Sequence, residues 1–121
     1  MIGVGVDVVE IERFRNVLAR TPNVRERLFT PIELEYCSRQ ADPVPSLAAR
    51  FAAREAVMKS LGLGLGAFGF HEAWVELEES GAPRLRVTGR AWELAVDRGV
   101  VRWHLSLSHD SPVAVAVVIA E

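Results

Sequence analysis

The chain has 121 residues and a formal net charge of −2; half of its residues are hydrophobic and a quarter are charged. This length and balance indicate one globular domain over residues 1–121, with a modest core of its own. They give no support for binding to nucleic acid or to an acidic membrane. The single cysteine, Cys37, excludes an intrachain disulfide and a cysteine-based metal cage.

No stretch approaches about 20 consecutive apolar residues, and the N-terminus lacks a basic region followed by an apolar one. We therefore expect a soluble, cytoplasmic protein. The charge is unevenly distributed, because five arginines and one acid, Glu26, lie between Arg13 and Arg27. This imbalance predicts one basic surface element.

The chain opens with a predicted strand and helix. Residues 1–11 are rich in valine and broken by glycine, which favours a strand. Residues 12–20 have the apolar spacing of a helix. Arg13 and Arg20 are about two turns apart and should share one face of that helix.

Two further helices are expected before the middle of the chain. The first, over 31–39, has a strong start signal, because Thr30 suits the N-cap and Glu33 completes a capping box. The second and longer helix follows the break "ADPVPS"; Ser46 can cap it, and it should end at Ser60.

The second half of the chain predicts strands around one short helix. A glycine-rich connector leads to a hairpin, a helix that ends at Gly99, and two final strands. The order is β-α-α-α-β-β-α-β-β, which predicts an α+β fold with a mainly antiparallel sheet packed by the long helix. In this second half, the expected ranges are 61–70 for the connector, 72–80 and 83–89 for the hairpin strands, 90–99 for the helix, and 100–108 and 112–120 for the last two strands.

Asp7 stands out because it lies within an apolar strand. In strand alternation it shares a face with Gly3 and Gly5, and glycines beside a carboxylate would let a ligand approach the backbone. The alternative is a structural aspartate that caps a turn or pairs with an arginine.

Glu55 and Lys59 are spaced i, i+4 on the long helix, so their side chains lie on one face. A solvated ion pair worth ~0.3–0.5 kcal/mol would explain that spacing by itself. However, the apolar neighbours indicate that much of this helix is buried. Two carboxylates from separate elements, Asp7 and Glu55, would form a hard-oxygen site of the kind that binds Mg²⁺ together with substrate phosphates. Lys59 beside it would suit a phosphate group.

The sequence "LSLSHDSP" places His109 and Asp110 where a strand opens into a turn, a position where binding groups collect. Asp110 could also be a turn-forming residue only. His71 and His104 are interpreted as structural. No phosphate-binding glycine pattern is present, since "GLGLG" has the wrong shape for one.

Taken together, "GVGVDVVEIERF", "TPIEL", "RFAAREAVMKSLG", "GAPRLRVTG" and "WHLSLSHD" resemble, in order and spacing, the holo-acyl-carrier-protein synthases, the short bacterial class of 4′-phosphopantetheinyl transferases. The resemblance covers essentially the whole chain. It implies the 4′-phosphopantetheinyl transferase fold. It also implies transfer of 4′-phosphopantetheine from coenzyme A to a serine of apo acyl carrier protein, with release of adenosine 3′,5′-bisphosphate. Fatty acid biosynthesis is the expected pathway, and polyketide carriers are further candidate substrates.

The resemblance also implies roles for individual residues. Asp7 and Glu55 match the Mg²⁺ ligands, Lys59 the lysine at the diphosphate, and His109 the histidine near the coenzyme A phosphates. Family members are usually homotrimers with each site shared across a subunit boundary, so the first motif of one chain and the long-helix motif of another are expected to meet. Further coenzyme A contacts are expected from Arg50, Gly81, Pro83 and Arg84, and contacts to the acidic carrier from Arg13, Arg20 and Arg27.

The sequence departs from the family pattern at three positions. Arg54 replaces the lysine of the family's "FAAKEA", and a planar guanidinium differs from an ammonium group. "GAP" stands where "GKP" or "GRP" is common, although Arg84 could compensate. Asn23 stands where a basic residue is frequent.

Two questions stay open at this point. The base that accepts the serine proton is Glu55, acting through a metal-bound water, or else Asp110. The rival interpretations of the whole chain are a coenzyme A or nucleotide-binding module without chemistry and a structural trimer with a solvated charged helix.

Overall fold

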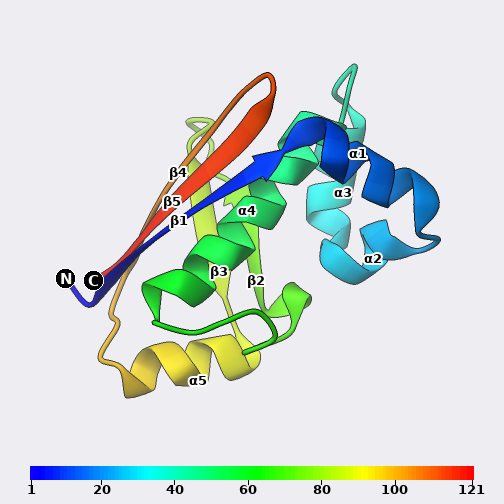
Figure 1. Cartoon of the computed structure of the whole chain (residues 1–121). Coiled ribbons are helices and arrows are strands. Elements are labelled where there is room, and N and C mark those ends of the chain that lie inside the picture. The colour runs from blue at the N-terminus through cyan, green and yellow to red at the C-terminus, as the bar shows by residue number, and fades with distance from the viewer.

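The computed structural model describes all residues 1–121 as one α+β unit, with a long helix lying across strands (Figure 1). The strands are β1 (Gly3–Glu10), β2 (Ala73–Leu77), β3 (Pro83–Val87), β4 (Trp103–Asp110) and β5 (Val113–Ala120). The helices are α1 (Ile11–Arg20), α2 (Val24–Leu28), α3 (Pro31–Ser38), α4 (Val44–Ser60), the 3-10 turn η1 (Phe70–Glu72) and α5 (Gly89–Asp97).

The strands form two antiparallel sheets, one of order β1-β5-β4 and the other the hairpin β2-β3. In the first sheet Asp7 pairs with Ala116, and Ala116 pairs with Leu107. These three residues therefore share the inner face of the sheet, toward α4. The α+β class and the antiparallel pairing confirm the prediction from the sequence.

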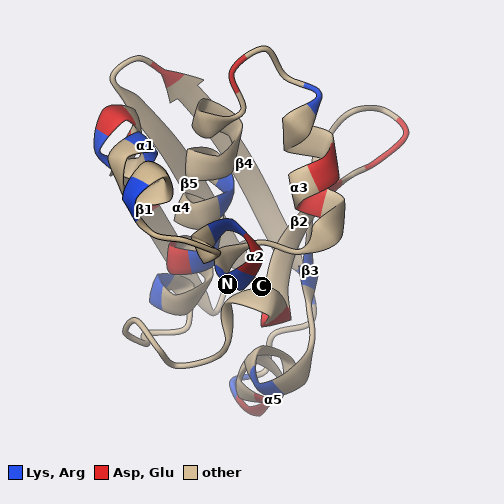
Figure 2. Cartoon of the chain, turned by 90° about the vertical axis from the view of Figure 1, so that its right-hand side faces the viewer, with Lys and Arg blue, Asp and Glu red and all other residues tan.

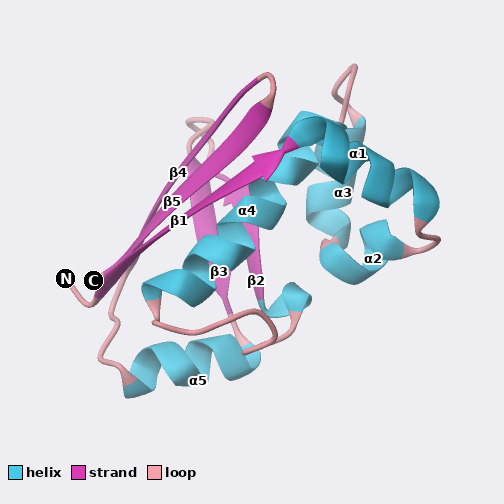
Figure 3. Cartoon of the chain, viewed as in Figure 1, coloured by secondary structure: helices cyan, strands magenta, loops and turns pink.

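Helix α4 is the central element: it packs against the β1-β5-β4 sheet, mostly against β1 and β5, and also contacts β2 of the second sheet (Figure 3). Its contact with β1 is backbone to backbone, because a Cβ atom at Gly3 would lie 1.9 Å from the carbonyl oxygen of Ser60. A Cβ atom at Gly5 would lie 1.9 Å from that of Ala56. The expectation that these glycines make room for a ligand is wrong, since the helix occupies that space.

Two clusters of buried side chains fill the interior. The larger cluster joins α4, α5 and both sheets, and includes Val57, Met58 and Val118. The smaller joins α1, α2, α3 and the start of α4, and includes Phe14, Phe29 and Leu47. Helix α4 contributes side chains to both clusters, so close packing on most of its surface holds its position and rotation.

Most predicted elements are present, with local differences. Thr30 and Glu33 form the expected capping box on α3, and Gly99 follows α5 with a left-handed φ of 82°. Helix α2 was not predicted, because its five residues carry too little periodicity to recognise. Ser46 is not an N-cap, since α4 already begins at Val44. None of the helices has the length and apolar character needed to cross a lipid bilayer.

Candidate functional site

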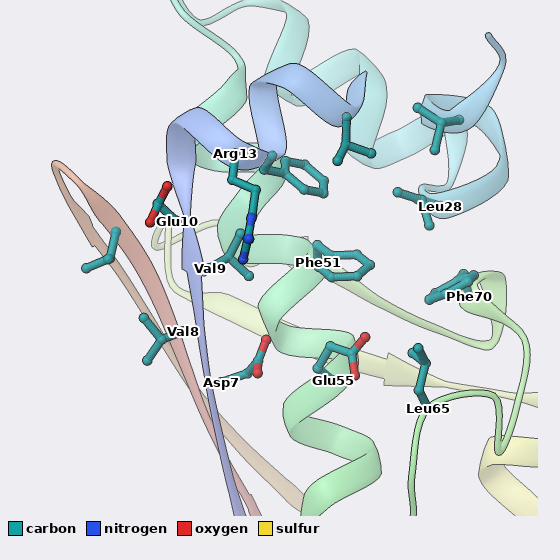
Figure 4. Close-up of a pocket in the computed structure, with 14 residues that line it drawn as sticks. Asp7, Val8, Val9, Glu10, Arg13, Leu28, Phe51, Glu55, Leu65 and Phe70 are labelled. Atoms are coloured by element: carbon teal, nitrogen blue, oxygen red, sulfur yellow. The ribbon is translucent and has the colours of Figure 1, made fainter. Parts of the chain in front are cut away.

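A cavity of about 690 Å³ opens between β1, α1, α2, α4 and the segment around Phe70 (Figure 4). Its walls are largely apolar, and its charged lining residues are Asp7, Glu10, Arg13 and Glu55. Asp7 comes from β1 and Glu55 from α4, and the two lie next to each other at one end (Figure 4). The fold thus brings together, within one chain, the two carboxylates that the sequence singled out. The expectation that these two motifs would meet across a subunit boundary is wrong, because α4 packs directly against β1 of the same chain.

Lys59 joins this group through Asp7. Its Nζ donates to Asp7 Oδ1 at 2.9 Å and to the carbonyl oxygen of Val6 at 3.1 Å. The Asp7 side chain is 17% exposed, whereas that of Lys59 is 52% exposed, so the ammonium group remains open to solvent on one side. Asp7 therefore forms an ion pair, and its partner is Lys59, one helical turn beyond Glu55, instead of an arginine.

The pKa of Glu55 reflects its partly buried position beside a second carboxylate. Burial raises the pKa of Glu55 above its usual value, and the nearby Asp7 carboxylate raises it further. Lys59 opposes both effects and lowers the pKa of Glu55. The net shift of the pKa is upward, because burial and the Asp7 carboxylate together outweigh the effect of Lys59.

This donor set fits a divalent cation of the Mg²⁺ type. Mg²⁺ is commonly held by one or two carboxylates plus substrate phosphates and water, and Asp7 and Glu55 supply the two carboxylates. No group of three or more metal-binding side chains exists in the chain. The remaining ligands would therefore come from substrate and solvent.

Arg54 does not belong to this site. Its side chain is fully buried and forms an ion pair with Glu33, in which Nη1 donates to Oε2 at 2.8 Å and Nη2 to Oε1. Its Nε donates to the carbonyl oxygen of Phe70 at 2.7 Å. Glu33 also accepts from the backbone N–H groups of Thr30 and Val75. Arg54 is a structural link between α3, α4, η1 and β2.

The other predicted coenzyme A contacts lie away from the carboxylates within one chain. Pro83 and Arg84 line a separate cavity of about 340 Å³ between β3 and β4, and Gly81 lies in the adjoining turn. His109 and Asp110 are exposed at the end of β4, outside the cavity of Asp7 and Glu55.

Arg50 is buried rather than open to the cavity. Its guanidinium lies 4.8 Å from the centre of the Tyr36 ring, and Nη1 donates to the carbonyl oxygen of Ser46. Its Nε is buried without a hydrogen-bond partner, and no carboxylate pairs with it. Its predicted contact with coenzyme A stays a prediction.

The apolar walls of the large cavity were not identified as functional from the sequence. Phe51 lies one turn before Glu55, so its position was readable from helical spacing. Phe70 packs 6.1 Å from Phe51, ring centre to ring centre. Leu65, in the glycine connector, and Val24 and Leu28, on α2, carry no local signal, because only tertiary packing brings them to Glu55.

Comparison with known proteins identifies the family of this chain. The family model described as "4′-phosphopantetheinyl transferase superfamily" matches residues 3–118. A holo-[acyl-carrier-protein] synthase of Streptomyces avermitilis is 53% identical, over all of this chain and 98% of the relative.

Solved structures show the same fold. The holo-[acyl-carrier-protein] synthase of Neisseria meningitidis has a TM-score of 0.88 and 30% identity, over 100% of this chain and 98% of that one. The Helicobacter pylori synthase, solved in complex with coenzyme A, has a TM-score of 0.84 and 28% identity, over 98% of this chain and 99% of that one. The match of the family model, the 53% identity over the full chain and the shared fold show that this chain belongs to the 4′-phosphopantetheinyl transferase superfamily.

Proposed function

We propose that this protein is a holo-[acyl-carrier-protein] synthase, which transfers 4′-phosphopantetheine from coenzyme A to a serine of apo acyl carrier protein. The products are the holo-carrier and adenosine 3′,5′-bisphosphate. A carrier of fatty acid biosynthesis is the first substrate to test, and polyketide carriers are the second. The relatives that are similar over the full chain carry this name, and one of the similar structures holds coenzyme A.

The observation that carries the proposal is the meeting of Asp7 and Glu55 in one cavity, with Lys59 beside them. A coenzyme A diphosphate placed there would face two carboxylates that require a divalent cation between protein and substrate. When bound, Mg²⁺ would neutralise the diphosphate and stabilise the charge that develops on transfer.

The reaction is an in-line displacement at the β-phosphorus. A bond forms between the carrier serine oxygen and this phosphorus, and the bond to the bridging oxygen breaks, which releases the bisphosphate. Lys59 would stabilise that departing charge; the 52% exposure of its side chain, beside Asp7, supports this role. The serine proton passes to Glu55 through a water molecule. The raised pKa of Glu55 suits a proton acceptor. Asp110 is the second candidate base.

We also propose a homotrimer with shared sites. The outer face of the β1-β5-β4 sheet carries Val4, Val6 and Val8, which are about half exposed, beside Ile119, Val117 and Val115 in register. Such a contiguous apolar face is unusual on a monomer. A neighbouring subunit would cover it, and would bring its own His109, Pro83 and Arg84 toward the Asp7–Glu55 pair, which these residues do not reach within one chain.

The carrier would bind over α1 and α2. Arg13, Arg20 and Arg27 are exposed and have no ion-pair partner, whereas Arg15 is engaged by Glu12 and Asp42. Figure 2 shows basic segments on α1 and around α2. An acidic carrier would be steered to these unpaired cations.

The test is incubation of the protein with apo acyl carrier protein, coenzyme A and Mg²⁺, followed by mass spectrometry of the carrier. We expect a gain of one phosphopantetheine group that requires all components. Binding of coenzyme A without any mass gain on fatty-acid or polyketide carriers would instead establish a binding module.

A further inference from the structure

The short turn η1 is a junction at which three consecutive residues are each fastened to a different helix. The carbonyl oxygen of Phe70 accepts from Arg54 Nε of α4 at 2.7 Å. The ring of His71 contacts the carbonyl oxygen of Glu26 in α2, with Nε2 at 2.7 Å. The Glu72 carboxylate accepts from the backbone N–H of Ala91 in α5 at 3.0 Å. The bonds of Phe70 and Glu72 join η1 to the longer helices α4 and α5. The bond of His71 joins it to the five-residue helix α2.

Helix α2 depends on outside support. It has five residues, too few for a stable helix in isolation, and no side chain caps its N-terminus. Its first residue follows Asn23, which has a left-handed φ of 63°. Because a carbonyl oxygen can only accept, the Nε2 atom of His71 must carry the proton and donate to Glu26.

The hydrogen bond between His71 and Glu26 lies beside a second cavity. A cavity of about 390 Å³ lies between α2 and η1, with Arg27 and His71 among its lining residues. It shares Val24, Leu28 and Phe70 with the large cavity that holds Asp7 and Glu55. The position of α2 relative to η1 therefore sets the width of both cavities and the direction of Arg27.

We propose that His71 is a positioning residue for the carrier: its hydrogen bond to Glu26 holds α2, and with it Arg27 and the apolar wall, in the arrangement that receives the acyl carrier protein. This inference rests on the proposed function. It assigns His71 to carrier binding only, because His71 lines neither the carboxylate pair nor the cavity of Pro83 and Arg84.

The chain allows a test without loss of the fold. His71 is exposed and belongs to neither buried cluster, so its replacement removes no core packing. The variants are His71→Ala, which removes the donor, and His71→Gln, whose side-chain amide can donate to the same carbonyl. Steady-state kinetics are measured separately against carrier and against coenzyme A, together with amide hydrogen exchange.

We expect His71→Ala to raise the KM for the carrier about three- to tenfold, the scale of one lost hydrogen bond, with kcat and the KM for coenzyme A unchanged. The amides of Arg27 and Phe29, which bond to Asn23 and Arg25, should exchange faster, because α2 opens more often. His71→Gln should restore both values toward the wild type.

Two kinetic results would overturn the inference: a His71→Ala variant with wild-type KM for the carrier, or one whose KM rises equally for both substrates as its melting temperature falls. If the wild type transfers nothing to any carrier, the proposed function fails. The exchange rates of α2 in the two variants then decide whether His71 positions α2: an unchanged rate in His71→Ala would refute it.

Discussion

The backbones of Gly5 and Ala56 touch, and this contact sets how far Asp7 stands from α4. A Cβ atom at Gly5 would lie 1.9 Å from the Ala56 carbonyl oxygen, and a helix backbone cannot yield as a flexible side chain can. Asp7, two residues along the same strand face, is therefore held at the depth at which it meets Lys59 and Glu55. Gly5 is thus required for the packing of β1 against α4. It affects the site only indirectly, through that packing.

Replacement of Gly5 by alanine should lower the free energy of unfolding by about 3 kcal/mol or more, because the added methyl group forces β1 from α4. Chemical denaturation measures this loss. Gly64→Ala is the matched control, since a Cβ atom at Gly64 meets nothing within 4 Å. Its stability should stay within about 0.5 kcal/mol of the wild type, and equal losses in the two variants would contradict the packing explanation.

Glu55→Gln should abolish transfer and leave the fold intact. The effect of this substitution on stability depends on pH, because the pKa of Glu55 in the folded state is raised above its ordinary value of 4.5. A carboxyl group with a raised pKa stabilises the fold only while it is protonated, and that contribution is lost as the pH rises through the folded pKa. Without divalent metal, the variant should therefore melt above the wild type at neutral pH, and the difference should vanish below about pH 4.5.

Addition of Mg²⁺ provides the control for that experiment. It should raise the melting temperature of the wild type and narrow the gap to Glu55→Gln, since only the wild type offers both carboxylates. If Glu55→Gln transferred at the wild-type rate in the presence of Mg²⁺, Glu55 would not be a ligand of the metal.

Reversal of Arg13 and Arg20 to glutamate should raise the KM for the carrier and flatten its dependence on salt, because unpaired cations that attract an acidic protein are lost. The KM for coenzyme A should hardly change. Arg90→Glu, on the exposed surface of α5, reverses a charge away from α1 and should leave both values unaltered. Equal loss of both affinities in the double variant would indicate misfolding instead.

Val6→Asp should disrupt the trimer, because it places a charge in the middle of the apolar sheet face next to Val117. Light scattering after size exclusion should show monomers, and transfer should fall with the loss of shared sites. Ile32→Asp, at a residue of α3 that is 55% exposed, is the control and should keep the wild-type mass. A monomeric wild type with full activity would refute the shared site.

Arg54→Met should lower the free energy of unfolding by about 3–5 kcal/mol, because Glu33 would remain buried without its counter-charge. Arg54→Lys keeps that charge and should lose much less. Denaturation curves of the two variants measure the difference. A comparable loss in both would mean that the planar guanidinium, with its bond to Phe70, matters more than its charge.

The sequence by itself determined much of the architecture and the family to which the chain belongs. Valine content and glycine marked β1, the capping box marked α3, and the i, i+4 spacing aligned Glu55 with Lys59, because these signals act over a few residues. The resemblance named the family correctly, since its motifs are also local. The metal, the shared site and the carrier contacts stay predictions.

Only the tertiary structure decided which of these residues meet. It assigned Gly3 and Gly5 to helix packing, Lys59 to Asp7, and Arg54 to a buried pair with Glu33, 21 residues away in sequence. It also revealed α2, whose five residues are held by contacts such as His71 to Glu26 and not by their own propensity. The physical reason is common to all four: close packing and ion pairing join residues distant in sequence, and no local pattern records the partner.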